Sequence, residues 1–559
     1  MASYREAQIR HARYYKTVLS EADELYCHGG ESADEALKVL TDELDNIRRG
    51  QDSSYELVES DRSMAELCRD YAMHGANLLN LQFHPNEQLE WGEAGLASAR
   101  RLQDQVSEAA ILSNLGMALE DLGAFSQSLE YQQQALAIAQ AAGDRFTEET
   151  TLGNLGSLYH SLARYNEAID CYERQLAIAS EIGDHRGEAN ALMNIGITRS
   201  DLGECREAIE KFESALAIFQ VTGNRRGEGQ AHGNLGTAYA YLGDYAKALE
   251  YYKQDLAMCR ELGDRRGEAN VQLNIATTYA DLGEHVKALE HYEIPLEIVR
   301  ELRDRRGEGR ILSNIGISYL DTGEPRRALD YYQQALSIAE EIGDRDGEDT
   351  ALINLGLTNW WLQDSDAAQK CFERALKLAR EIGDRRNEQA ALGNLGLIYQ
   401  TAEKYAKAID YYQQALKIAR SVEDVRTEGL CLMNIGIVGH LMGGHRESIT
   451  MLEAALQIFV AIGDKYNETI VLGDLGNSYA ALGDSVKAFD SYTEALRGAR
   501  ANNDSRTEAN VLFNMSLDLY KHGRSEEAIV SAKEALVIFE RIEDRNVETV
   551  RRHLSEWES

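Results

Sequence analysis

The chain has 559 residues, a formal net charge of -35 and only three prolines. The acidic surplus argues against nonspecific binding to nucleic acid or to anionic membranes, because both ligands need a positively charged surface. The scarcity of proline favours an almost entirely helical protein, because proline breaks the interior of helices.

The sequence contains none of the motif spacings that mark a catalytic or metal-binding site. The thirteen histidines and seven cysteines include no HExxH, no CxxC pair and no Cys/His cluster, and neither Gly-x-Ser-x-Gly nor GxxxxGK[ST] occurs. We therefore expect no catalytic residue, no metal and no cofactor. The scattered cysteines and the lack of a long apolar segment predict a soluble cytoplasmic protein with reduced thiols.

The N-terminal segment, residues 1–63, is predicted to be a helical cap with helices at 4–27 and 33–49, separated by the sequence HGGES. The next forty residues, 64–103, keep only part of the pattern that follows. Leu96 stands in register, but His84-Pro85-Asn86 occupies the turn. We interpret residues 64–103 as a degenerate repeat.

Residues 104–543 form eleven repeats of forty residues, without insertion or deletion. One position is asparagine in all repeats but one, at Asn114, Asn154, Asn194, Asn234, Asn274, Asn314, Asn354, Asn394, Asn434 and Asn514, with Asp474 in the gap. A small residue follows two positions later, and leucine recurs from Leu136 to Leu536. A fixed period of this size predicts a solenoid of stacked helix pairs. Residues 544–559 are predicted to form a single capping helix.

Residues 223–262 illustrate one repeat. Gly223 suits a left-handed turn, and Asn224, which is aspartate in the other repeats, can cap a first helix that runs to about Leu242. After a turn at Gly243-Asp244, a second helix is predicted from Tyr245 to Leu262. Apolar residues recur three and four positions apart, so each helix has one apolar face.

The repeat resembles the tetratricopeptide repeat in the spacing of Leu235-Gly236, Tyr239, Ala248, Tyr252 and Leu256. HEAT and armadillo repeats have a similar length but lack this Gly-Tyr-Ala-Tyr spacing. The resemblance implies an all-α solenoid, a superhelix of antiparallel helix pairs. The Asn-Leu-Gly and Gly-Asp-Arg segments are similar to those of Leu-Gly-Asn-rich polarity adaptors and of tetratricopeptide sensor arrays in prokaryotic signal-transduction ATPases. The nucleotide-binding loop of those ATPases is absent from the sequence.

The column of asparagines is the main candidate binding site. An amide offers both a donor and an acceptor, which match the N–H and C=O of an extended peptide. In tetratricopeptide proteins the first helices line the concave surface, so the resemblance implies that these side chains face a groove. The predicted groove residues are Asn154, Asn194, Asn234, Asn274, Asn314, Asn354, Asn394 and Asn434. The alternative is that each asparagine bridges the helices of adjacent repeats.

A second column lies seven residues beyond the asparagines and is acidic in the middle of the array. We include in the predicted groove Asp201, Tyr241, Asp281, Asp321, Trp360 and Trp361. This column fits a partner segment with basic and apolar residues, although a solvated acidic face explains it equally well. Of the two tryptophans, we expect one in the core and one exposed.

We predict a non-enzymatic scaffold that holds an extended segment of a partner protein in its groove, as an adaptor or sensor subunit. One alternative is a regulatory subunit that restrains a protease or ATPase, and another is a self-assembling architectural protein. The arginine pairs such as Arg225-Arg226 are predicted to form ion pairs between repeats rather than to bind nucleic acid. Pro295, inside a predicted second helix, is expected to kink it.

Overall fold

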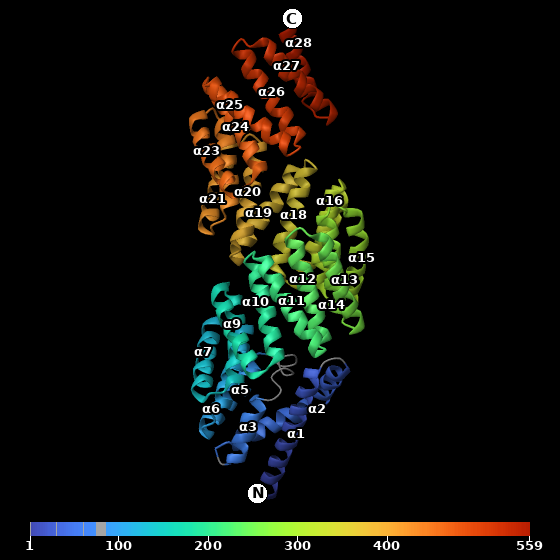
Figure 1. Cartoon of the computed structure of the whole chain (residues 1–559), viewed down its shortest axis with the longest axis vertical. Coiled ribbons are helices and arrows are strands. Elements are labelled where there is room, and N and C mark those ends of the chain that lie inside the picture. The colour runs from blue at the N-terminus through green and yellow to red at the C-terminus, as the bar shows by residue number, and fades with distance from the viewer. Residues whose placement is uncertain (1, 29–30, 60, 74–84) are drawn as a thin grey trace. The chain divides into compact units, whose positions relative to one another are not determined.

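The computed structural model describes residues 2–28, 31–59, 61–73 and 85–559, and these form helices and short turns without a strand (Figure 1). The predicted all-α fold is confirmed. The protein divides into two compact units, Met1–Ile298 (unit 1) and Val299–Ser559 (unit 2). Among the described helices, none is long and apolar enough to cross a membrane.

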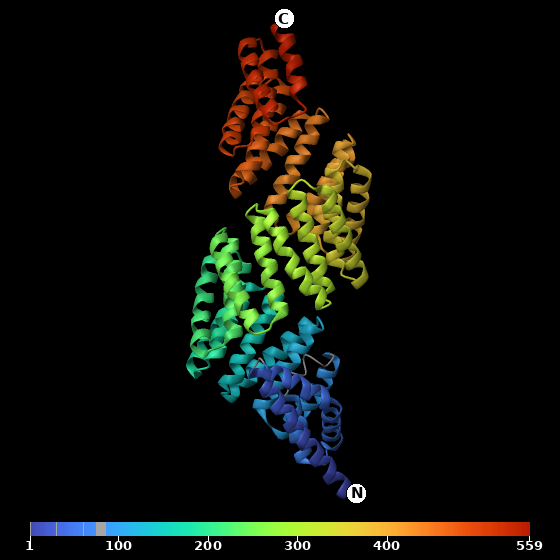
Figure 2. The same ribbon diagram turned by 90° about the vertical axis from the view of Figure 1, so that its right-hand side faces the viewer.

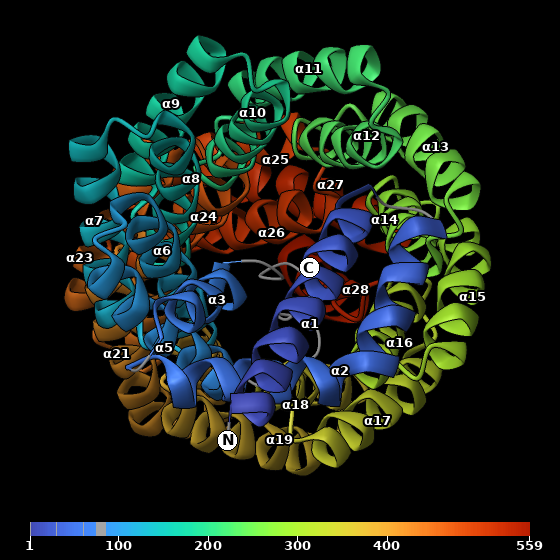
Figure 3. The same cartoon turned by 90° about the horizontal axis from the view of Figure 1, so that it is seen from below.

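Unit 1 contains successive helices that pack on their neighbours in the sequence. They are α1 (Ala2–His28), α2 (Glu31–Leu57), α3 (Arg62–Met73), α5 (Pro85–Leu102), α6 (Gln105–Asp121), α7 (Phe125–Ala142), α8 (Arg145–Ser161), α9 (Tyr165–Ile182), α10 (His185–Asp201), α11 (Cys205–Thr222), α12 (Arg225–Tyr241), α13 (Tyr245–Glu261), α14 (Arg265–Asp281) and the first part of α15 (His285–Glu301). Within this unit α8, α10 and α12 lie on the inner side, and α9, α11 and α13 lie on the outer side (Figure 3). The first helices of the repeats therefore form one continuous inner surface.

Unit 2 continues the same alternation of helices to residue 559 (Figure 2). It contains α16 (Arg305–Asp321), α17 (Pro325–Ile342), α18 (Arg345–Trp361), α19 (Ser365–Ile382), α20 (Arg385–Thr401), α21 (Tyr405–Ser421), α22 (Val425–Leu441), α23 (His445–Ile462), α24 (Lys465–Leu482), α25 (Ser485–Ala501), α26 (Ser505–Lys521), α27 (Ser525–Arg541) and α28 (Val547–Glu558). Each first helix packs against the second helix that follows it, as a solenoid of helix hairpins requires.

The junctions between helices follow the predicted turn chemistry. Gly223 has a φ of 69°, a left-handed conformation that costs glycine nothing because it lacks a Cβ. The Asn224 side chain accepts a hydrogen bond from the backbone N–H of Gly227 and so caps α12. Helices α12 and α13 end within a residue of the predicted boundaries. The local sequence is thus sufficient to set these helix limits.

The small residue two positions after each asparagine is a packing contact between the paired helices. A Cβ added at Gly236 would lie 2.6 Å from the ring of Tyr252, which is 3% exposed. The same pairing recurs in unit 2 between Gly316 and Tyr332, again at 2.6 Å. A side chain at Gly236 or Gly316 would therefore require the facing ring to move or the two helices to separate, because protein interiors are close-packed. The glycine and the aromatic ring therefore fix the distance between the two helices.

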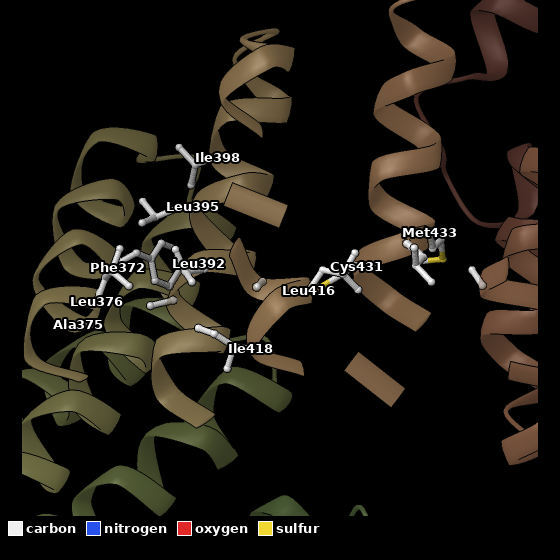
Figure 4. Packing of buried hydrophobic residues seen from close by; sticks show 14 of the residues in the cluster. Phe372, Ala375, Leu376, Leu392, Leu395, Ile398, Leu416, Ile418, Cys431 and Met433 are labelled. Carbon is white, nitrogen blue, oxygen red and sulfur yellow. The ribbon is translucent and has the colours of Figure 1, made fainter. Parts of the chain in front are cut away.

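In unit 2 the buried residues of successive repeats merge into a continuous core (Figure 4). Phe372 of α19 packs with Leu392 and Leu395 of α20, and the cluster extends through Leu416 to Cys431. Each helix therefore buries its apolar face against the preceding and the following helix, rather than in one central core.

The ion pairs at the helix junctions match the prediction only in part. Arg225 and Arg305, the first arginines of two of the pairs, contact glutamates of their own repeats, whereas the second arginine Arg306 contacts Asp344 of the next repeat. Arg225 contacts Glu228 at 2.7 Å and Glu261 at 2.7 Å. Arg260 of α13 contacts Glu268 of α14 at 2.9 Å. Glu228 and Glu268 are largely buried but the arginines are half-exposed, so each pair contributes on the order of 1 kcal/mol or less.

Two N-terminal boundaries differ from the sequence-based predictions. Helix α2 begins at Glu31 and extends to Leu57, past the predicted end at residue 49. Gly50, the first residue after the predicted end, lies inside α2 as a close-packing position, because a Cβ there would lie 2.1 Å from the Tyr71 hydroxyl. Within residues 64–103, Pro85 of the predicted turn is the first residue of α5, and the predicted turn residue His84 lies outside the described residues.

Helix α15 continues from His285 to Glu301 with Pro295 inside it. The proline therefore does not end the helix. The expected kink at Pro295 stays a prediction.

Candidate functional site

A groove of about 1270 Å³ runs along the inner side of unit 1. Helices α8, α10, α12 and α14 line it, and each contributes the asparagine of the predicted column. Because the repeat is forty residues long without interruption, Asn154, Asn194, Asn234 and Asn274 occupy the same position on successive first helices. The fold therefore brings these four amides into one site.

The four amides differ in their partners. Asn154 donates a hydrogen bond from Nδ2 to the hydroxyl of Ser113, at 3.0 Å, and so bridges α6 and α8. The side chains of Asn194, Asn234 and Asn274 are half-exposed and form no hydrogen bond with another described residue of unit 1. The bridging alternative thus holds at Asn154. The other three amides present free donors and acceptors to the groove.

In unit 2, Asn314 and Asn354 line a smaller groove of about 480 Å³ with α17 forming part of its wall. Asn394 and Asn434 occupy the same helix position on α20 and α22 and are also partly exposed.

The second predicted column does not line the groove of unit 1. Asp201, Tyr241 and Asp281 are exposed at the last residue of their helices, and Tyr241 is 72% exposed. Asp201 Oδ2 lies 2.8 Å from His160 Nε2, which links α10 to α8. Asp321 is also an exposed helix-terminal residue. The lining of the groove extends along the first helices as far as Ser157, Ile197 and Thr237, about one turn before the last residue of each helix.

The two tryptophans divide as predicted. Trp360 is partly buried and packs against the hydrophobic cluster of unit 2, whereas Trp361 is 61% exposed at the end of α18. Trp361 is therefore the more accessible of the two tryptophans.

Three arginines that sequence reasoning did not place in the groove line one side of it. Arg186, Arg226 and Arg266 are exposed, and none of them forms an ion pair within the described part of unit 1. The corresponding Arg306 of unit 2 contacts Asp344 at 3.1 Å. Asp344 follows Arg306 by thirty-eight positions. The residue thirty-eight positions after Arg186 is Asn224, which carries no charge, so the sequence indicated that Arg186 cannot form the equivalent ion pair. The unit 1 groove thus offers cationic donors as well as amides.

In unit 2 the column of asparagines and the column seven residues beyond it do meet, in a cavity of about 460 Å³ lined by residues of α22, α24, α25 and α26. Asp474 and Asn514 line it together with Leu441, Ala481 and Lys521. Burial raises the pKa of Asp474 to about 7, although Asn477 donates a hydrogen bond from Nδ2 to Asp474 Oδ1 at 3.4 Å.

Within residues 2–28, 31–59, 61–73 and 85–559, there is no cluster of three or more His, Cys, Asp or Glu side chains that could bind a metal ion. The thiols described as free in this part of the protein are Cys68, Cys171, Cys205, Cys259, Cys371 and Cys431. Burial raises the pKa of Cys431 to about 12, so this thiol is protonated at neutral pH.

Solved structures with related arrangements of helices are distant in sequence. BtubC from P. vanneervenii is 22% identical, with a TM-score of 0.35 over 40% of this protein and 90% of that one. A STAND protein with a tetratricopeptide repeat sensor from Pyrococcus horikoshii is 17% identical, with a TM-score of 0.44 over 75% and 74% of the two proteins. The apo quorum sensor NprR from B. thuringiensis is 16% identical, with a TM-score of 0.42 over 72% and 99%. These scores support no inference about function.

A search of curated proteins gives no match. The family model of the tetratricopeptide repeat does match, at residues 107–181, 147–220, 202–261, 227–293, 267–341, 348–421 and 430–501. These segments together span more than half of the sequence and coincide with the helix hairpins of the structure. The protein therefore belongs to the tetratricopeptide repeat family.

Proposed function

We propose that this protein is a non-enzymatic adaptor or sensor subunit that holds an extended segment of a partner protein in the groove of unit 1. The observation that carries the proposal is the set of three half-exposed amides, Asn194, Asn234 and Asn274, which line one groove without a side-chain hydrogen bond in the described part of unit 1.

The lack of a partner among the described residues of unit 1 distinguishes these three amides from polar side chains that have a purely structural role. A polar group retained for structural reasons is usually paired within the protein, as Asn154 is with Ser113. An asparagine amide can donate to a backbone carbonyl oxygen and accept from a backbone N–H. Three such amides on successive helices suit a peptide backbone, whose groups repeat regardless of sequence. The exposed Arg186, Arg226 and Arg266 supply further donors along the same path.

Apolar side chains give the groove a second kind of contact. Met193 and Ile197 of α10 line it, and Phe146 of α8 is 63% exposed at its edge. A partner segment with apolar as well as basic residues would bury this surface, which supports binding by the hydrophobic effect.

The proposal extends to the organisation and location of the protein. We propose an N-terminal helical cap at 1–63, a degenerate repeat at 64–103, eleven repeats at 104–543 and a capping helix at 544–559, the last supported by α28 packing on α27. We also propose the forty-residue Asn-Leu-Gly variety of the repeat and a cytoplasmic location. The buried free thiols fit a reducing compartment.

The test combines identification of the partner with matched variants. Partners that copurify from the native host are identified by mass spectrometry, and the bound segment is mapped by crosslinking. Affinity for that segment is then measured for the wild type and for Asn194→Ala/Asn234→Ala/Asn274→Ala. Each lost amide leaves partner groups unpaired, at roughly 1–3 kcal/mol per site. We therefore expect a loss of at least about a hundredfold in affinity.

The matched control removes three exposed amides from outer helices, as Gln133→Ala/Asn166→Ala/Gln413→Ala. It should bind as the wild type does, and circular dichroism should show unchanged helix content in both triple variants. If the groove variant binds normally, or if it unfolds, the asparagine column is structural and the proposal is wrong.

A further inference from the structure

The floor of the unit 1 groove contains a carboxylate that comes from an outer helix. Asp255 lies on α13, is 8% exposed and lines the groove. Its two oxygens point toward Gly229 and Gly233 of α12. A Cβ added at Gly233 would lie 2.6 Å from Oδ2, and one added at Gly229 would lie 3.2 Å from Oδ1. The two glycines therefore leave room for the carboxylate beside α12, where all three residues line the groove; we call this gap the Asp255 window.

The neighbouring repeats close this window. At the positions forty residues before and after Gly233, the chain carries the large, buried side chains of Met193 and Leu273. At the position of Asp255 the same repeats carry Ala215 and Pro295. Across the eleven repeats, only this one has glycine at both window positions. The glycines and the aspartate thus occur together, where they form a single feature.

The carboxylate has no counter-charge. Oδ1 accepts a weak hydrogen bond from the Cys259 thiol at 3.5 Å, and no lysine, arginine or histidine in the described part of unit 1 forms an ion pair with Asp255. Burial raises its pKa to about 6, and the charge of Asp264 adds to the effect. At neutral pH the group is therefore mostly ionised, although it is buried. A buried ionised carboxylate without a partner is unfavourable, and a cation that reached it would remove that penalty.

We propose that the Asp255 window is a subsite for one basic side chain, lysine or arginine, of the segment bound in the groove. The subsite rests on the proposed function, because the groove amides would hold the segment that delivers the basic group. Met258 and Leu262 of the same outer region also line the groove and can cover the aliphatic stem. The window would then select the register in which a segment binds.

The residues of the groove itself offer one competing partner. Arg226 and Arg266 line the same groove, yet neither contacts the Asp255 carboxylate in the structure. Should Arg226 turn inward in solution, it would neutralise Asp255 and abolish any preference for a basic ligand. Neutralisation of Asp255 by Arg226 would then appear as equal binding of basic and norleucine peptides.

The test uses short fluorescein-labelled peptides of alternating serine and valine with one variable central residue: arginine, lysine, norleucine or glutamate. Binding is measured by fluorescence anisotropy. The wild type should bind the arginine and lysine peptides roughly tenfold more tightly than the norleucine peptide. Asp255→Asn should remove this preference, so that the variant binds the arginine, lysine and norleucine peptides with equal affinity. Gly233→Ala, which places a methyl group in the window, should reduce the preference as well. Glu250→Gln, the same change of charge at an exposed position of α13, should retain it.

A second measurement is independent of peptide binding. n-Butylguanidinium alone is titrated into the wild type and Asp255→Asn, with the backbone amide NMR signals of Gly229 and Gly233, which both proteins contain, as the readout. The proposal requires a saturable shift in the wild type and tighter binding there than in the variant.

Each outcome decides a different claim. Equal binding of the arginine and norleucine peptides by the wild type would refute the subsite and leave the proposed function standing. If none of the peptides binds but n-butylguanidinium does so through Asp255, the subsite holds and binding of an extended segment is contradicted. If neither ligand distinguishes the wild type from Asp255→Asn, Arg226 or solvent already satisfies the carboxylate and the subsite is refuted.

Discussion

Asp349 of α18 should make unit 2 less stable as the pH rises toward neutrality. The residue is fully buried, and neither carboxylate oxygen has a hydrogen-bond partner of normal geometry among the described residues. Burial raises the pKa of Asp349 from 3.8 to about 6. Because the folded protein retains a proton that the unfolded protein releases in this interval, the free energy of unfolding falls as the pH rises from about 4 to about 6. Asp349→Asn removes the ionisation and should therefore stabilise the protein.

The size of the gain follows from the two pKa values. A shift of about two pH units corresponds to roughly 3 kcal/mol of stability lost by the wild type at pH 7.5. At pH 5 the loss should be roughly half as large, because the folded state is still mostly protonated there. The buried amide of the variant resembles the protonated acid in size and polarity, so its own cost is similar at every pH.

Native-state hydrogen exchange of the α18 amides can measure the effect, since repeats open locally. The opening free energy is compared between the wild type and Asp349→Asn at pH 5 and pH 7.5. Asp330→Asn, the same change at an exposed position of α17, is the control and should alter it by about 0.5 kcal/mol or less. A gain that is equal at both pH values, or absent, would refute the reasoning, because it would show that Asp349 is not an unpaired buried acid.

Three further changes test the packing and the turns of unit 2. Leu392→Ala, at a fully buried position, should lower the local free energy of unfolding by on the order of 2–5 kcal/mol. Hydrogen exchange should then show unfolding that spreads from α20, and a single uniform transition would contradict the solenoid model. Gly316→Ala places a methyl group 2.6 Å from the Tyr332 ring and should lower stability by roughly 1–3 kcal/mol in urea denaturation; an unchanged midpoint would show that the helices can separate. Gln363→Gly, where φ is 64°, should raise the free energy of unfolding by about 1 kcal/mol, and a loss would contradict backbone strain there.

Much of the fold could be predicted from the sequence because the signals are local. The cap at Asn224 and the left-handed Gly223 lie within a few residues of the helix ends that they define. The forty-residue period repeats this local information, so it also predicts that Asn194 and Asn234 occupy equivalent positions. Gly50 shows the limit of such reasoning, because its role depends on Tyr71, which belongs to another helix.

The site depended on contacts that no period reveals. Whether an asparagine is free or bridging is decided by its neighbour, as Ser113 decides it for Asn154. The groove of unit 1 stops short of Asp201, because its lining on α10 ends at Ile197, one turn earlier. The Asp255 window needs residues of α12 and α13 that meet only when the two helices pack. Hydrogen bonds and cavities depend on distances between side chains of different helices, and tertiary packing alone sets those distances.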